Sequence, residues 1–95
     1  MNHIDSDRAE KTVTIVNQRG LHARAAAKFV KLVTEHSSEI EVTKDGETVS
    51  GGSIMGLMML AAAIGSSIRI SAVGTDAKDA VDAITRLVES KFDED

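Results

Sequence analysis

Four segments of the chain alternate between apolar and polar residues, as a β-strand with one buried face does. They cover residues 12–17, 39–43, 47–50 and 67–72. Asp45 and Gly46 lie between the second and third segments and favour a hairpin turn there, because both residue types tolerate positive φ. The pattern therefore predicts four strands, with a hairpin joining the middle two.

Three further segments have apolar residues at the spacing of an amphipathic helix. We expect helices at residues 23–35, at residues 53–62 with Ser53 as N-cap, and from Asp76 onward, with Asp76 and Asp79 capping the last one. The apolar stripes are Ala26, Phe29, Val30 and Val33 in the first helix, Leu57, Leu60, Ala61 and Ile64 in the second, and Ala80, Val81, Ile84, Leu87 and Val88 in the third.

The order β-α-β-β-α-β-α predicts an α/β (α+β) fold. Each helix has one apolar face, so all three can cover one side of a single sheet in a two-layer, open-faced sandwich. Residues 1–10 are polar and aperiodic, which predicts a disordered tail before one domain at residues 11–95. The outer face of the sheet is expected to be polar, with Thr12, Thr14, Glu39, Glu41 and Thr43.

Composition excludes several classes of protein. The chain has 42% hydrophobic residues but only two aromatic ones, Phe29 and Phe92, so the core must be mainly aliphatic. It has no cysteine, which excludes disulfides and is consistent with a reducing cytoplasm, where we expect it to act. Its histidines, His3, His22 and His36, lack metal-ligand spacing, and we expect neither a metal nor another cofactor.

Membrane and nucleic-acid functions are not expected either. The most apolar stretch, residues 54–64, is much shorter than the roughly 20 residues that span a bilayer. The N-terminus lacks the pattern of a signal peptide. A net charge of −4 and strands without aromatic residues argue against a nucleic-acid binder. The composition is that of a small, acidic, soluble protein.

The segment Gly20-Leu21-His22-Ala23-Arg24 is the main candidate for chemistry. It places His22 at the start of a helix, where unpaired N–H groups and the helix dipole favour an anion. Arg24 adds a charged fork that binds phosphate oxygens. A neutral imidazole is nucleophilic at pH 7 without a dedicated base. The segment thus suggests a site of covalent phosphorylation; the alternative is a solvated histidine in a loop.

Two surfaces are candidates for partner binding. Arg24, Lys28 and Lys31 share one face of the first helix, either as a docking surface for an acidic partner or as a solvated face. The second helix is apolar on both sides, so one side must stay exposed, and flexible methionines suit a surface that accepts several partners. This exposed side, the Met patch, consists of Ile54, Met55, Met58 and Met59.

Two segments together resemble a known family. Gly20-Leu21-His22-Ala23-Arg24, continued by Ala25-Ala26-Ala27-Lys28-Phe29-Val30, is similar to the active-site segment of HPr, the histidine phosphocarrier of the bacterial phosphoenolpyruvate-dependent phosphotransferase system. Ser53-Ile54-Met55-Gly56-Leu57-Met58 resembles the second helix of that family, with its regulatory serine. The likeness covers residues 12–87, and the ending Lys91-Phe92-Asp93-Glu94-Asp95 is similar to the nitrogen-branch variant, NPr.

One position departs from the family pattern. The family usually has proline directly after the arginine, whereas this chain has Ala25 and no proline anywhere. Proline in the first turn pre-sets φ for the helix. We therefore expect a slightly looser helix start, with the chemistry of the site unchanged.

The resemblance implies a strand order of 1-4-2-3, all antiparallel, and specific roles at the site. It implies that His22 carries the phosphoryl group on Nδ1, facing the backbone N–H groups of Ala23 and Arg24, with Arg24 taking part in the reaction. It further implies that Ile54, Met55 and Met58 contact the donor, enzyme I, and an acceptor of the IIA type.

Ser53 and the wider function leave alternatives open. Ser53 is a helix cap, a site for a serine kinase and phosphorylase, or both. We expect a monomeric carrier, not an independent catalyst, acting in sugar uptake or in the nitrogen and carbon regulatory branch. The rival interpretation is a regulatory binding module controlled by Ser53 without obligatory phosphotransfer.

Overall fold

The structure, a computed structural model, describes residues 7–94. Its elements are β1 (Arg8–Thr14), α1 (Ala23–Thr34), β2 (Glu39–Lys44), β3 (Glu47–Ser50), α2 (Ile54–Met59), β4 (Ser67–Val73), α3 (Ala77–Glu89) and a short 3-10 turn, η2 (Lys91–Asp93).

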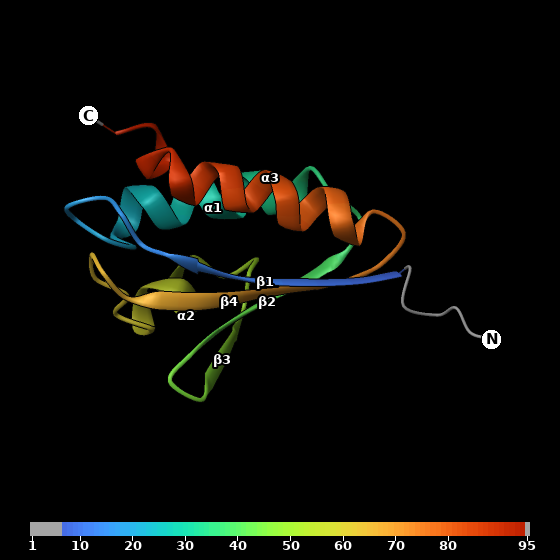
Figure 1. Cartoon of the computed structure of the whole chain (residues 1–95), viewed down its shortest axis with the longest axis horizontal. Coiled ribbons are helices and arrows are strands. Elements are labelled where there is room, and N and C mark those ends of the chain that lie inside the picture. Colours follow the sequence, from blue (N-terminus) through green and yellow to red (C-terminus); the bar gives the residue numbers. More distant parts are fainter. Residues whose placement is uncertain (1–6, 95) are drawn as a thin grey trace.

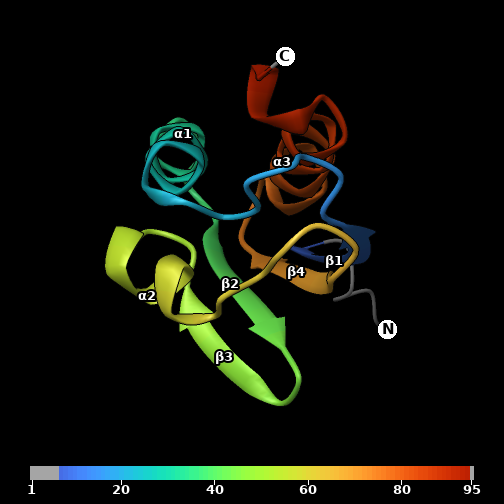
Figure 2. The same ribbon diagram turned by 90° about the vertical axis from the view of Figure 1, so that its left-hand side faces the viewer.

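The four strands form one antiparallel sheet in the order β1-β4-β2-β3. The helices α1 and α3 lie side by side over one face of this sheet, and α2 packs against α1 and β3 (Figures 1 and 2). This confirms the open-faced sandwich expected from the hydrophobic pattern and the strand order implied by the resemblance.

Alternation along the strands decides which face is buried. Val42 and Ile70 face each other across β2 and β4, and both are fully buried beneath the helices. Thr12, Glu39 and Glu41 point to the other side and are exposed. Because successive side chains in a strand point to opposite faces, the sheet presents one apolar face to the helices and one polar face to solvent.

The first strand begins earlier than the alternation suggests. Residues 8–10, assigned to a disordered tail by the sequence, form the start of β1, where Ala9 pairs with Ala72 of β4. Polar residues are tolerated here because β1 is an edge strand, and charged side chains protect such an edge. The tail predicted for residues 1–6 lies outside the described residues.

The second helix is shorter than expected. It ends at Met59, and the chain then turns through Ala61, whose φ is +52°. Leu57 is buried as predicted, but the arc breaks after Leu60, and Ala61 and Ile64 are exposed. The segment after α2 contacts the β1–α1 loop instead of continuing the helix.

Residues 62–63 pack against the β1–α1 loop. The carbonyl of Ala62 accepts a hydrogen bond from the Leu21 N–H at 3.0 Å. Gly20 has a φ of +65°, and a Cβ there would lie 2.4 Å from the same carbonyl oxygen. Only glycine fits this close approach in a left-handed conformation. The contact holds the loop that carries His22.

Asp76 stands at the N-cap of α3, but its side chain does not cap that helix as predicted. Its carboxylate instead accepts hydrogen bonds from the N–H groups of Ser37 and Ser38, at 2.9 and 3.0 Å, and from the Ser38 hydroxyl. These three hydrogen bonds, together called the Asp76 clamp, join the α1–β2 loop to the β4–α3 loop. Chiefly through the Ser38 hydroxyl, these bonds lower the pKa of Asp76 to about 2.

The Asp76 clamp predicts a pH-dependent stability. A carboxyl whose folded pKa lies below its unfolded value of about 3.9 stabilises the fold above that value and loses this effect as the pH falls toward the folded pKa. Asp76→Asn should lower the Tm at pH 7, and its difference from wild type should shrink between about pH 5 and pH 2. Circular dichroism melts across this range test it. Asp79→Asn, at an exposed position of α3, should have a much smaller effect, and a pH-independent loss at Asp76 would contradict the clamp.

Candidate functional site

His22 occupies the N-cap position of α1, with φ −74° and ψ 178°. Its imidazole makes no capping hydrogen bond, and the first-turn N–H groups of a helix have no partner within the helix. The N–H groups of Ala23 and Arg24 belong to this first turn. The positive end of α1 is thus directly beside a histidine side chain that is only 14% exposed.

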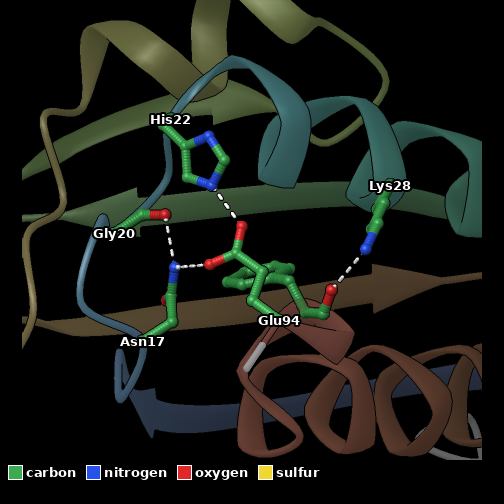
Figure 3. A network of polar contacts seen from close by, with 6 residues as sticks. Asn17, Gly20, His22, Lys28 and Glu94 are labelled. Carbon is green, nitrogen blue, oxygen red and sulfur yellow. Dashed lines mark hydrogen bonds and ion pairs between the residues drawn. The ribbon is translucent and has the colours of Figure 1, made fainter.

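The imidazole is held by a carboxylate from the other end of the chain. Nε2 of His22 hydrogen-bonds to Oε2 of Glu94, and the second carboxylate oxygen accepts from Nδ2 of Asn17 at 3.1 Å (Figure 3). The same Asn17 nitrogen donates to the Gly20 carbonyl at 2.9 Å. Asn17 is almost fully buried, so the arrangement has a rigid base.

Electrostatics keep Glu94 ionised. Its hydrogen bond with His22, supported by that from Asn17 and by the charges of His22 and Arg19, lowers the pKa of Glu94 below its ordinary value, against the opposing effect of desolvation. An ionised carboxylate only accepts hydrogen bonds. The proton shared with His22 therefore belongs to Nε2.

A short turn after α3 brings Glu94 to this place. Phe92 in η2 is completely buried in the core, and its carbonyl accepts a hydrogen bond from Nζ of Lys28 at 2.6 Å (Figure 3). Lys91, Phe92 and Asp93 all have positive φ, which turns the chain back toward α1. The C-terminal turn is thus anchored by one aromatic side chain and one lysine.

Cations gather around the site although the chain is acidic overall. A depression beside Glu94 is lined by Arg19, Arg24, Lys28 and Lys91, together with Asp93. Arg24 is exposed at the first turn of α1. The local surplus of positive charge favours an anionic group at this end of the molecule.

The basic face predicted on α1 exists, but its residues differ in their surroundings. Arg24 and Lys31 are exposed. Lys28, between them, is half-buried and donates to the Phe92 carbonyl. Lys28 therefore has a structural partner within the chain, which was not expected from the helix pattern.

Of the residues predicted around α2, Met58 lies near His22. Met58 lines a shallow depression together with Arg19, Leu21 and His22. The Ser53 hydroxyl caps α2, as expected, by accepting a hydrogen bond from the Gly56 N–H at 2.9 Å. The Met patch is exposed: Ile54 40%, Met55 71%, Met58 43% and Met59 71%.

Two side chains at the site were not identified from the sequence. Asn17 precedes the motif, and Glu94 lies 72 residues away from His22 along the chain. The only sequence feature that pointed to a role for this segment was Phe92, a large apolar residue in an otherwise polar ending. Such a residue indicates that the segment returns to the core.

The arrangement suits a phosphoryl group on the free ring nitrogen. Within residues 7–94, no group hydrogen-bonds to Nδ1 of His22, which lies on the side of the ring away from Glu94 (Figure 3). In the same part of the chain, no cluster of three or more potential metal ligands occurs, and no helix has the length and apolarity needed to cross a membrane.

Comparisons with known proteins identify similar chains. Residues 9–90 match a family model described as the PTS HPr component phosphorylation site. Phosphocarrier protein HPr of Cupriavidus necator is 41% identical over 85 residues, covering 90% of this chain and 96% of that protein. Phosphocarrier protein NPr of Shewanella violacea is 45% identical over 85 residues, covering 90% and 93%.

The crystal structure of HPr-C-His from Thermoanaerobacter tengcongensis superposes with a TM-score of 0.88 at 45% identity, over 92% of this chain and 98% of that one. Sequence and fold agree over nearly the whole length. This chain belongs to the HPr family of phosphocarrier proteins.

Proposed function

We propose that this protein accepts a phosphoryl group on His22 from phospho-enzyme I and passes it to a protein of the IIA type. The position of His22 carries the proposal: it is the N-cap residue of α1, two residues before Arg24, and its Nδ1 lies on the side of the ring away from Glu94. Family membership supports the general carrier role within the phosphotransferase system.

In the first transfer, the Nδ1 lone pair attacks phosphorus, and the P–N bond to the donor histidine breaks. The bonding electron pair stays on the donor ring, so no external base is needed. In the second transfer, the acceptor attacks phosphorus and the electron pair of the His22 P–N bond returns to Nδ1. The phosphoryl oxygens face the N–H groups of Ala23 and Arg24 in both steps.

The strength of these contacts suits a carrier. A helix N-terminus stabilises an anion by about 0.3–1 kcal/mol at a surface and by up to about 2 kcal/mol when partly buried. One charge-assisted hydrogen bond from Arg24 adds about 1.5–3 kcal/mol. Together they hold the phosphoryl group long enough for a second encounter without trapping it.

Docking is proposed at the surface around His22. Met55 and Met58 offer exposed, adaptable apolar area, and Lys31 offers positive charge on the neighbouring helix. The carrier would act as a cytoplasmic monomer in either the sugar branch or the nitrogen branch, since relatives include both HPr and NPr. Assaying which purified IIA protein accepts the phosphoryl group distinguishes the branches.

Phosphorylation at His22 is tested directly. Incubation with phosphoenolpyruvate and enzyme I should add one acid-labile, base-stable phosphoryl group, detected by intact mass and by phosphohistidine NMR. His22→Ala should remain unlabelled, whereas the control His36→Ala should label like wild type. Undiminished labelling of His22→Ala would falsify the assignment.

Arg24→Ala should slow both transfer steps by about 10- to 150-fold, the equivalent of one charge-assisted hydrogen bond. The Tm should change little, because Arg24 is exposed. Rapid-quench kinetics in both directions measure the effect. Arg69→Ala, which removes an exposed arginine from β4, should transfer at the wild-type rate. Equal rates for the two variants would remove Arg24 from the mechanism.

Ser53 tests the docking surface and the rival regulatory function together. Ser53→Asp places a charge beside Ile54 and Met55, and this charge must lose its hydration when a partner binds. We expect a higher KM of enzyme I for this variant and an almost unchanged Tm, because aspartate also caps helices. Ser53→Asn keeps the cap without the charge and should resemble wild type.

If KM is unchanged in Ser53→Asp, the Met patch is not the docking surface and Ser53 is only a cap. A partner that binds the protein according to the charge at Ser53 but needs no His22 would favour the regulatory module.

A further inference from the structure

We propose that Glu94 is a positioning residue for phosphotransfer, whose carboxylate holds the proton of His22 on Nε2 and so leaves Nδ1 as the nucleophile. This inference rests on the proposed carrier function and deepens it. It assigns a role to a residue near the C-terminus, outside the sequence motif that contains His22.

The first argument is the tautomer. A neutral imidazole carries its proton on one of its two nitrogens. Oε2 of Glu94 lies within hydrogen-bonding distance of Nε2, and an ionised carboxylate can only accept. The proton must therefore be on Nε2, and the lone pair available for attack is on Nδ1, which lies beside the first turn of α1.

The second argument is the rigidity of the carboxylate. Nδ2 of Asn17 donates to Glu94 and to the Gly20 carbonyl. Because both partners are acceptors, the orientation of this amide is determined by its contacts. Asn17 is 1% exposed, and the turn that carries Glu94 is anchored by buried Phe92. The carboxylate is thus fixed from two sides, as an orienting group needs to be.

The third argument is charge balance during transfer. When the Nδ1 lone pair forms the P–N bond, the ring becomes a phosphoimidazolium whose Nε2 proton is retained. The Glu94 carboxylate lies against that proton and balances the new positive charge. When the acceptor takes the phosphoryl group, the electron pair returns to Nδ1 and the neutral imidazole is restored. No proton has to leave or return in either step.

This arrangement follows a general pattern in histidine chemistry. A carboxylate that accepts from one imidazole nitrogen orients the ring, selects the tautomer and stabilises the imidazolium that forms. At this site Arg19, Arg24 and Lys28 line the same depression as Glu94, whose carboxylate accepts from Nε2 of His22. The ring thus has the carboxylate at Nε2 and leaves Nδ1 on the side away from Glu94 (Figure 3).

Two variants separate the charge of Glu94 from its hydrogen bond. Glu94→Leu removes both, and Glu94→Gln keeps an acceptor oxygen of similar reach without the charge. Glu89→Gln removes an exposed carboxylate at the end of α3 and is the matched control. The Tm of each variant is measured first, so that a released C-terminal turn is recognised.

The tautomer is measured in the free protein by ¹⁵N NMR of His22 above the pH at which the ring is protonated. We expect the Nε2–H form alone in wild type and in the control, and a mixture containing Nδ1–H in Glu94→Leu. A tautomer unaffected by Glu94→Leu would overturn the positioning role, and this measurement needs no partner protein.

Transfer kinetics with phospho-enzyme I provide the second measurement. Both Glu94 variants should show kcat lowered by about tenfold, the effect expected for loss of a charge-assisted hydrogen bond, with KM unchanged. A raised KM with unchanged kcat would identify Glu94 as a docking residue. Faster transfer would show that the contact of Glu94 with His22 inhibits phosphotransfer. Either result overturns the inference.

The outcomes also distinguish this inference from the carrier function. If wild-type His22 is not phosphorylated at all, the carrier function fails whatever the tautomer. If wild type transfers normally and Glu94→Leu matches it in both rate and tautomer, only the role of Glu94 fails.

Discussion

Burial of a single face of the sheet is the constraint on which the rest of the structure depends. Val42 and Ile70 lie on that face and are fully buried, so α1 and α3 must both lie on it. The polar outer face leaves no second layer available for a helix. With one covered face, the loop after β1 and the turn after α2 meet at the same end of the molecule, where Leu21 hydrogen-bonds to Ala62.

The site is assembled at this end from segments that are distant along the chain. The β1–α1 loop supplies His22, the turn after α2 supports that loop, and the turn after α3 supplies Glu94 (Figures 2 and 3). Burial of Phe92 is what stabilises the last of these contributions, because burying a large aromatic side chain is worth about 1.5–3 kcal/mol or more. A residue of the hydrophobic core, Phe92, thus holds the turn that carries Glu94 to the polar site.

Charge is distributed unevenly, and this matters for a phosphocarrier. The chain has a net charge of −4, yet two arginines and two lysines line the depression beside Glu94, the hydrogen-bond partner of His22. A local surplus of positive charge favours anionic groups, whereas the net negative charge of the chain favours solubility. Asp93 and Glu94 are the acidic residues of this depression, and the contact of Glu94 with Nε2 gives its negative charge a defined partner.

Much of the fold and the centre of the site could be predicted from local sequence. The alternation in residues 39–43 and 67–72 identified both the strands and their buried faces, because the period of a strand is a local property. His22 and Ser53 were correctly placed at helix starts for the same reason. The strand order was implied only by resemblance to the family, since periodicity does not say which strands pair.

Tertiary structure alone decided the features that depend on a distant partner. The segment after α2 and the carboxylate of Asp76 both contact other loops, and no local pattern records such contacts. The contact between His22 and Glu94 joins residues 72 positions apart. The sequence by itself determined which side chains are apolar, which helix begins at His22 and what chemistry an imidazole offers there. Only the folded chain decided which carboxylate reaches that imidazole, because the path of the C-terminal turn back toward α1 depends on how the whole core packs.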